Sequence, residues 1–497
     1  MGRFEEKIAK YSLAILIMKL EFPLNKFIVT TLIFASLLLI NPAYVSSFTN
    51  DQKASYVIGQ KDFKSMSPNG GELTANQFSF YGPSGIAFDK EGNLWVAELM
   101  NNRILGFYAP PASWGTSIPI SKSAGVVIGQ KDFTTTDTNS GGLSASSLES
   151  PLGMKFDLKG NLWVTDSGNN RILRYSAPLR TGQSADLDIG QKDFVSNNYG
   201  VGGERPSNGT LNPPAAPVLP SADTLHTPYD LAFDSSGNLW VADTGNNRVL
   251  KYSAPLRTGQ SADLVIGQKD FVSGEINSGG LSANSLNNPR SVSLSGNELW
   301  IGDYKNGRIL GYNPCVSSSS LNATLDIPSV CTVPGNIASG QSADIVLGKK
   351  DFTSTNTPYP TLISSLNSPF GIVFDSSGNL WITDEFKESI SEFKPLDICS
   401  GRRIPIVECH QYLGELANVY ADAKLKTVEF RNEQTPSLVI GKSASDGMST
   451  GAGTLRDPSY LAFDPHSNLW VSDFRNNRVL KYDNFPIILL APTNGTR

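Results

Sequence analysis

Gly237-Asn238-Leu239-Trp240-Val241 is the stretch that decides the fold, because close copies of it stand at five other places in the chain. The copies begin at Gly92, Gly160, Asn297, Gly378 and Ser467. A unit that recurs every several tens of residues indicates a series of small, similar sheets. The composition agrees, since 39% of the 497 residues are hydrophobic and 18% are charged, as in an ordinary globular protein with a substantial core.

Each unit contains four apolar runs short enough to be strands. The first run follows a proline, an Asp-x-x-Gly-Asn segment such as 234–238 then reverses the chain, and the run with the tryptophan is the second strand. The third run begins at an arginine such as Arg248. We expect the fourth strand at 57–63, 127–133, 188–194, 265–271, 346–352 and, in a shortened version, 438–442.

The order of these runs predicts how the array closes. One fourth strand stands before the first proline, and none follows the last third strand at 479–482. Six complete sheets therefore form only if the N-terminal strand joins the last one, which also hides the sheet edges. We predict an all-β, closed ring of six four-stranded antiparallel sheets over residues 48–483, followed by a tail at 484–497.

An acid ends the second strand, and an arginine opens the third strand five residues later. The pairs are Glu98/Arg103, Asp166/Arg171, Asp243/Arg248, Asp303/Arg308 and Asp473/Arg478. Across the intervening turn the two side chains can face one another as a bidentate ion pair. Five regular copies favour a structural role over a catalytic one. The fifth unit has Asp384 and Ser389 instead, so we expect its acid to lack this partner.

The succession of proline, apolar strand, Gly-Asn-Leu-Trp-Val, acid and Asn-Asn-Arg-Ile/Val-Leu resembles the NHL repeat. The chain is thus similar to NHL-repeat β-propellers across residues 54–483, with six blades. The departures are Glu98 in place of aspartate, the missing turn glycine of the fourth blade and the missing arginine of the fifth. The resemblance implies that ligands bind on the face where the loops before the prolines and the loops between second and third strands emerge.

The leader at 1–47 predicts export. An apolar run at 27–40 follows Lys19 and Lys26 and precedes small residues ending at Ser47, in the pattern of a signal peptide cleaved near Phe48. An uncleaved membrane anchor is the alternative, and translation starting at Met18 is a second open point. We therefore expect a secreted or cell-surface protein, in contact with a membrane only if the leader is retained.

The net charge bears on the class of partner, and the cysteines bear on disulfide bonds. The chain has a formal net charge of −5, and the leader carries a net positive charge, so the mature chain is more acidic and nucleic acid is disfavoured as a partner. The four cysteines form two close pairs. In an exported protein we expect disulfides joining Cys315 to Cys331 and Cys399 to Cys409.

The loop positions around each proline vary while the scaffold repeats, and they supply the candidate ligand-binding residues. A ring of basic, acidic, amide and aromatic side chains suits a small polar ligand or a peptide. Lys155 replaces a small residue of an inner strand near the axis, where its ammonium must reach water or an acid. The candidates are Tyr81, Glu149, Lys155, His226, Tyr229, Asp230, Asn287, Arg290, Asn367, Phe370, Arg456 and Tyr460.

Enzymes of related architecture are the main rival. Lyases that resemble this fold use converging histidines with a metal, but this chain has only three, and His226, His410 and His466 are not expected to converge. Lactonases of other six-bladed propellers bind a cation near the axis, and Glu149, Asp230, Asn287 and Asn367 keep that reading open. No nucleophile elbow or phosphate loop is present.

We therefore predict a monomeric, non-catalytic binding or adhesion scaffold with a protein, peptide or glycan ligand and without a cofactor or a resident metal. A metal-assisted lyase or lactonase at the axial mouth, and a structural component of the cell envelope, are the alternatives.

Overall fold

A computed structural model describes residues 45–72, 74–110, 120–199, 219–312, 315–317, 331–334, 337–354, 365–397, 428–429, 434–441 and 451–487. Most of them belong to one compact unit, Phe48–Asn484. A second unit contains the residues before Phe48 and after Asn484, of which the structure describes β1 (Val45–Ser47) and β30 (Phe485–Ile487), an antiparallel pair. The described residues contain no helix long and apolar enough to cross a membrane.

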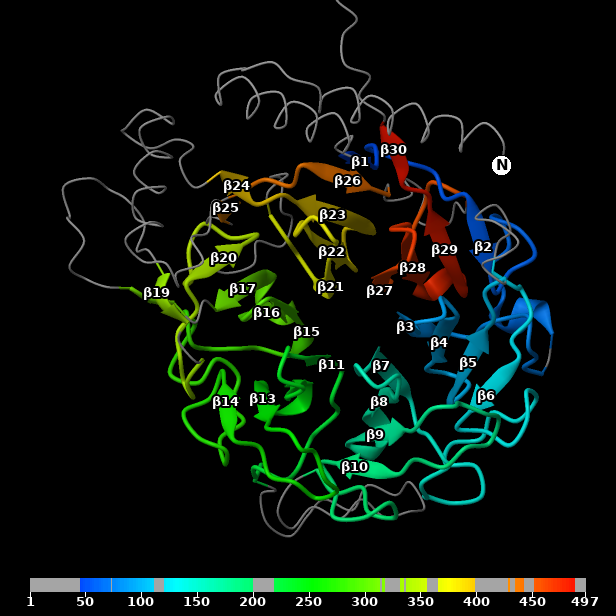
Figure 1. The fold of residues 1–497 in the computed structure, drawn as a ribbon, viewed down its shortest axis with the longest axis horizontal. Helices are drawn as coiled ribbons and strands as arrows, with labels where there is room; N and C mark the ends of the chain where they lie inside the picture. Colours follow the sequence, from blue (N-terminus) through cyan, green and yellow to red (C-terminus); the bar gives the residue numbers. More distant parts are fainter. Residues whose placement is uncertain are drawn as a thin grey trace, which may run out of the picture. The chain divides into compact units, whose positions relative to one another are not determined.

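The larger unit is a ring of six four-stranded antiparallel sheets, as the repeat predicts (Figure 1). Blade 1 consists of β3 (Pro83–Phe88), β4 (Leu94–Glu98), β5 (Arg103–Phe107) and β6 (Val126–Ile128). Blade 2 consists of β7 (Pro151–Phe156), β8 (Leu162–Asp166), β9 (Arg171–Tyr175) and β10 (Leu187–Ile189). Blade 3 consists of β11 (Asp230–Phe233), β12 (Leu239–Asp243), β13 (Arg248–Tyr252) and β14 (Leu264–Ile266). Blade 4 consists of β15 (Pro289–Ser295), β16 (Glu298–Asp303), β17 (Arg308–Tyr312) and β20 (Ile345–Leu347). Blade 5 consists of β21 (Pro369–Phe374), β22 (Leu380–Asp384), β23 (Ser389–Phe393) and β26 (Leu438–Ile440). Blade 6 consists of β27 (Pro458–Phe463), β28 (Leu469–Asp473), β29 (Arg478–Tyr482) and β2 (Tyr56–Ile58).

The N-terminal strand closes the ring. β2 pairs with β29 in antiparallel register, with Tyr56 opposite Lys481 and Ile58 opposite Val479. The sheet order β2-β29-β28-β27 makes β2 the outer strand of blade 6, so the two ends of the repeat array meet in one sheet (Figure 1). The prediction of closure is therefore confirmed, and it leaves blade 6 no unpaired outer edge at β29.

The fourth strands are shorter than the sequence predicts. β2 ends at Ile58, whereas the prediction extends to Phe63. Gly59 has a φ of +89°, a conformation that glycine adopts readily, and it turns the chain out of the sheet. The Gln-Lys-Asp-Phe segment that follows is a turn, in which Gln60 Nε2 donates to the carbonyl oxygen of Asn477 at 2.9 Å.

The blades pack through their tryptophans and through the aromatic residues that end the inner strands. Trp163 lies 5.4 Å from Phe233 of the next blade in an edge-to-face arrangement, and Trp95 lies 6.1 Å from Phe156 in the same way. The indole Nε1 of Trp163 donates to Asp157 Oδ2 at 3.0 Å, so the aspartate of the first hairpin turn also fixes the tryptophan. The repeated motif thus builds the hairpin and the contact between blades together.

Four further strands form two small pairs beside the blades. β18 (Cys315–Ser317) pairs with β19 (Cys331–Pro334), and β24 (Leu396–Asp397) pairs with β25 (Val428–Glu429). Cys331 stands opposite Ser317 in the first pair. Cys399 and Cys409, like the leader at 1–44, lie outside the described residues. Both disulfides remain predictions.

Candidate functional site

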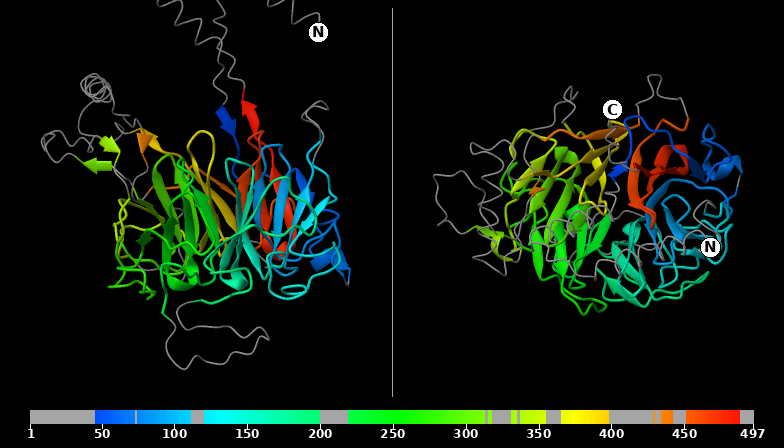
Figure 2. Two further views of the ribbon diagram at one scale, coloured as in Figure 1. Left: turned by 60° about the horizontal axis from the view of Figure 1, so that its bottom comes forward. Right: turned by 45° about the horizontal axis from the view of Figure 1, so that its top comes forward.

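The loop face is the end of the ring where the inner strands begin and the second strands end. The strand register places Pro83 opposite Glu98, Pro151 opposite Asp166 and Pro458 opposite Asp473, so the loop before the proline and the loop after the acid emerge together. Figure 2 shows the strands of the blades running between two faces of the ring, with loops at both. We call the face at these prolines the loop face.

The acid of each blade holds a candidate loop position in place. Its carboxylate accepts the backbone N–H of the residue two places before the proline, at 2.6 to 2.9 Å, in all six blades. The residues held in this way are Tyr81, Glu149, His226, Asn287, Asn367 and Arg456. Because the backbone bond fixes the position and leaves the side chain to vary, the scaffold can present different chemistry in each blade.

The arginine beneath this loop is a structural element, as predicted. Arg171 Nε donates to Asp166 Oδ2 at 2.7 Å, and both side chains are fully buried. Its remaining donors bond the carbonyl oxygens of Phe194 at 2.8 Å and Ser144 at 2.9 Å, which lie in the loops on either side of the arginine. Each such arginine therefore ties together the loops around one carboxylate, and a buried charge is acceptable there because its donors are satisfied.

Blade 5 replaces the arginine with lysines. Asp384 accepts the backbone N–H groups of Asn367, Ser368 and Lys387 at 2.8 to 3.2 Å. The ammonium of Lys349 donates to the carbonyl oxygen of Leu366 at 3.0 Å, and burial lowers the pKa of Lys349 to about 8 while Asp384 opposes this shift. Asp384 thus lacks the arginine, as predicted, but it is not left without hydrogen bonds.

Four predicted residues meet at the axis of the ring and bridge it. The hydroxyl of Tyr460 in blade 6 donates to the carbonyl oxygen of Tyr229 in blade 3, the opposite blade, at 2.6 Å. Phe370 packs edge-to-face against Tyr460 at 5.3 Å, and the guanidinium of Arg290 lies 4.8 Å from the centre of the Phe370 ring and 3.5 Å from that of Tyr304. We call these five residues the axial cluster.

The axial cluster is largely buried, and its arginine has an acidic partner. Arg290 Nη1 donates to Glu385 Oε2 at 2.9 Å, and Tyr460 and Phe370 are 5% and 7% exposed. Burial raises the pKa of Tyr460 well above its usual value, so its hydroxyl stays protonated and able to donate. The axial mouth, which the sequence offers as a site for a ligand, is therefore crossed by side chains that bind one another.

Asp230 and Lys155 are neighbours among the inner strands. Burial raises the pKa of Asp230, and the nearby Lys155 ammonium opposes this shift. Asp230 Oδ2 accepts the N–H of Val292 at 3.2 Å, whereas Oδ1 is buried without a hydrogen-bond partner in the described part of the chain. The backbone of Gly153 passes so close that a Cβ there would lie 2.8 Å from Asp230 Oδ1. The expectation that Lys155 meets an acid near the axis agrees with this arrangement.

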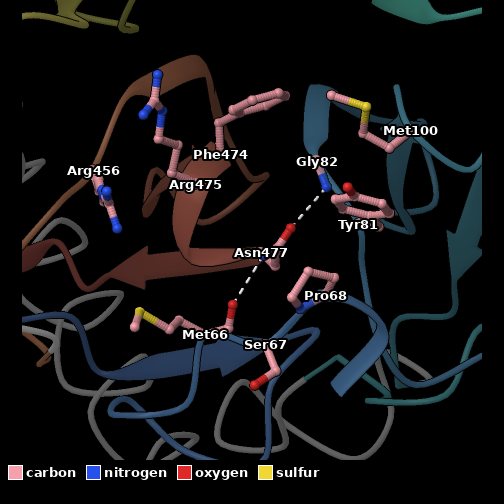
Figure 3. A pocket seen from close by; sticks show the side chains of 10 residues that line it. All are labelled: Met66, Ser67, Pro68, Tyr81, Gly82, Met100, Arg456, Phe474, Arg475 and Asn477. Carbon is pink, nitrogen blue, oxygen red and sulfur yellow. Dashed lines mark hydrogen bonds between the residues drawn. The ribbon is translucent and has the colours of Figure 1, made fainter. Parts of the chain in front are cut away.

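A second group of residues forms a recess of about 420 Å³ on the loop face between blades 6 and 1, which we call the seam recess (Figure 3). Its lining residues are Met66, Ser67, Pro68, Tyr81, Gly82, Met100, Arg456, Phe474, Arg475 and Asn477. Met66, Ser67 and Pro68 follow the closing strand β2. Arg456, Phe474 and Arg475 come from blade 6, and Tyr81 and Met100 belong to blade 1. Two predicted residues, Tyr81 and Arg456, thus meet here.

Asn477 joins the walls of the seam recess. Its Oδ1 accepts the N–H of Gly82 and its Nδ2 donates to the carbonyl oxygen of Met66, each at 2.9 Å (Figure 3). Gly82 has a φ of +65°, and a Cβ there would come within 3.0 Å of Met100 and 3.2 Å of Phe474. Any other residue at this position would strain the backbone and crowd both side chains.

The other predicted loop residues occupy separate positions. Glu149 Oε2 accepts a hydrogen bond from Asn139 at 3.1 Å, and the ring of His226 lies 5.1 Å from that of Tyr199. The carbonyl oxygen of Asn287 accepts the N–H of Lys305 at 3.2 Å, while the backbone N–H of Asn367 is bound by Asp384.

The candidate residues named from the sequence include none from the loops between second and third strands, although the face on which these loops emerge was predicted. Tyr304 belongs to the axial cluster, Glu385 binds the arginine of that cluster, and Met100, Phe474 and Arg475 line the seam recess. Each stands one or two places after the buried acid, where the sequence varies between blades although the following Asn and Arg recur. That contrast was a usable signal, but it is visible only when the six units are aligned on the acid.

Among the described residues, no group of three or more His, Cys, Asp or Glu is placed to hold a metal ion. His226 precedes the inner strand β11, whereas His466 follows the inner strand β27 in the first hairpin turn, so the two lie at opposite ends of the ring. His410 lies outside the described residues.

The ring of six four-stranded sheets with acid-anchored loops defines a six-bladed β-propeller. The family model "NHL repeat" matches residues 225–252, which cover the loop and strands around the Asp243/Arg248 pair. This match and the six-bladed ring together fit an NHL-repeat β-propeller. No curated protein matches it.

Several solved structures resemble the chain only distantly. A streptogramin B lyase is 13% identical, with 86% of this chain and 98% of that chain covered and a TM-score of 0.36. The virginiamycin B lyase of Staphylococcus aureus is 13% identical over 82% and 96%, with a TM-score of 0.34. A candidate gluconolactonase is 10% identical over 88% and 96%, with a TM-score of 0.40. Likenesses of this strength say nothing about the activity of the present chain.

Proposed function

We propose that this NHL-repeat propeller is a secreted or cell-surface scaffold that binds a protein, peptide or glycan ligand through its loop face without catalysis. The seam recess is the observation that carries the proposal. Three of its lining side chains are large, apolar and exposed, with Met66, Tyr81 and Met100 at 36%, 39% and 45%. Exposed apolar side chains gathered in one depression are typical of a binding surface. Export rests on the sequence of the leader alone.

The seam recess is a better candidate than the axial mouth because its side chains are not engaged with one another. Arg290 at the axis is paired with Glu385 and packed against aromatic rings. In contrast, the guanidinium of Arg456 has no hydrogen-bond or ion-pair partner among the described residues, although its backbone is anchored to Asp473. A ligand at the recess can therefore gain contacts without breaking those of the scaffold.

A binding screen tests this function. The mature protein is incubated with panels of peptides and oligosaccharides, and the melting temperature is recorded, since a ligand that binds only the folded state raises it. Ligands of the recess should stabilise the wild type and not the Tyr81→Ala/Arg456→Gln double variant. Hits that stabilise both proteins equally would place the binding site elsewhere and refute the proposal.

A cation-assisted lactonase or lyase is the second candidate, and Asp230 is the observation that favours it. Its buried, unpartnered Oδ1 is an orphaned acceptor of the kind that a hard cation satisfies. Since the described residues offer no metal-binding group of three acids, imidazoles or thiols, such a site would depend on Asp230 and amide oxygens. Thermal shifts with divalent ions that appear in the wild type and vanish in Asp230→Asn would support it; a flat response would dismiss it.

A further inference from the structure

The seam recess carries charge as well as apolar surface. Its lining includes two arginines and no acid, although the chain as a whole has a net charge of −5. Arg475 is ion-paired with Asp457, which lies just outside the lining, whereas Arg456 is not paired within the described residues. The seam recess therefore has one uncompensated positive charge, and this charge lies beside thioethers and aromatic rings.

This combination selects a particular kind of ligand. One free guanidinium matches one carboxylate, which it can bind with two parallel hydrogen bonds, better than it matches a doubly charged phosphate. The apolar walls from Tyr81, Met100 and Phe474 favour a hydrophobic group close to that carboxylate, and thioethers adapt to aromatic rings of different shape. A bare anion would leave these walls exposed to water.

We propose that the seam recess binds a monocarboxylate that bears an aromatic or branched aliphatic group, as at the C-terminal residue of a peptide, with Arg456 on the carboxylate and Tyr81, Met100 and Phe474 around the apolar group. This proposal rests on the proposed function, whose ligand class it names. It goes further than the proposed function in one respect, because a ligand in the seam recess contacts residues from both ends of the repeat array. Met66 and Pro68 follow β2, and Phe474 belongs to blade 6, so an occupied recess also reinforces the closure of the ring.

The test compares probes that differ in one group. A hexapeptide ending in phenylalanine with a free carboxylate, the same peptide ending in a carboxamide, and N-acetylphenylalanine are titrated into the full mature protein by calorimetry. We expect the carboxylate peptide to bind at least tenfold more tightly than the carboxamide. Binding of N-acetylphenylalanine with similar affinity would assign the site to small carboxylates, and its failure beside a binding peptide would assign it to peptide C-termini; each supports the ligand class.

Matched variants locate the binding. Arg456→Gln should remove the preference for the carboxylate, and it should fold normally because, in the described part of the chain, only the backbone of Arg456 makes hydrogen bonds to the scaffold. Arg180→Gln, the same change at an exposed arginine of the loop after β9, should leave affinity unchanged. Tyr81→Ala should weaken the free carboxylate and the carboxamide by similar factors, since it removes apolar contact and not charge.

The outcomes separate this inference from the function on which it rests. Equal affinity for carboxylate and carboxamide, or a preference that survives in Arg456→Gln, would overturn the ligand class. If other ligands from the screen still depend on Tyr81 and Arg456, the recess remains a binding site with a different ligand. If no ligand depends on them, both proposals fall.

Discussion

Replacing Asp188 with valine should stabilise the propeller, because Asp188 is a buried acid at a position where the other blades have valine. It is the middle residue of β10, opposite Leu173, and it is fully buried. Neither of its carboxylate oxygens makes a hydrogen bond of normal geometry with a described residue, although the backbone N–H of Gln191 is near enough to lower the pKa of Asp188, and Arg171 Nη1 is 3.6 Å away. The equivalent residues of the other outer strands are Val57, Val127, Val265, Val346 and Val439.

The size of the effect follows from this environment. Arg171 keeps its close partner Asp166 at 2.7 Å, so the substitution does not strand a buried arginine. Exchanging buried ionic groups for apolar groups of similar volume stabilises proteins by about 1–4 kcal/mol, provided that no partner charge is left buried alone. We expect about 2 kcal/mol for Asp188→Val. An unfolding entropy of about 2.1 cal/mol/K per residue over roughly 430 residues converts this into a rise of about 2 °C in melting temperature.

The gain should depend on pH, and its sign follows from the pKa of Asp188. Burial raises this pKa well above its usual value, although Arg171 opposes the shift. The folded state therefore holds a proton that the unfolded state releases, and the wild type loses stability as the pH rises from about 4 through the raised pKa. Asp188→Val does not suffer this loss. The difference in melting temperature between variant and wild type should thus widen from pH 4 to pH 8.

Differential scanning calorimetry at a series of pH values measures this difference. Asp186→Val is the matched control, because Asp186 lies just before the same strand but its side chain is 41% exposed and bound to Arg174 at 2.7 Å. The control should not gain stability with rising pH. An Asp188→Val protein that melts at or below the wild-type temperature at pH 8, or a difference that is the same at every pH, would show that the carboxylate is well solvated or bound, and the reasoning would fail.

Three further predictions concern the scaffold. Deleting residues 54–63 should lower the melting temperature of the whole ring, since it removes β2 and the turn that holds blade 6; an unchanged melting curve would disprove closure by this strand. Arg248→Met should destabilise by about 3–5 kcal/mol in urea unfolding, because Asp243 stays buried without its partner, whereas adding Asp243→Leu should restore part of the loss; a single variant as stable as the wild type would contradict this account. Mass mapping of the unreduced protein should find the linkages Cys315 to Cys331 and Cys399 to Cys409, and free thiols would show that the pairing or the export is wrong.

Much of the scaffold was predictable because its signals are local and repeated. The turn at 234–238 and the pair Asp243/Arg248 lie within a few residues of one another, so the hairpin geometry that joins them can be deduced from spacing. The length of the fourth strand could not be deduced in this way. In blade 3 the sequence pattern of the fourth strand continues to Phe271. The carbonyl oxygen of Phe271, however, accepts a hydrogen bond from Arg248, and this contact is visible only once both residues are placed.

The sequence by itself determined the number of blades, the strands within them and the closure of the ring by the chain's own beginning, because each rests on short-range patterning that six copies reinforce. The tertiary structure decided where a ligand can bind. Tyr460 reaches Tyr229, which lies 231 positions away in the chain, across the axis, and Asn477 bonds Met66 from 411 positions away. No spacing in the sequence encodes such contacts, since they depend on how side chains from different blades share the space that the closed ring leaves between them.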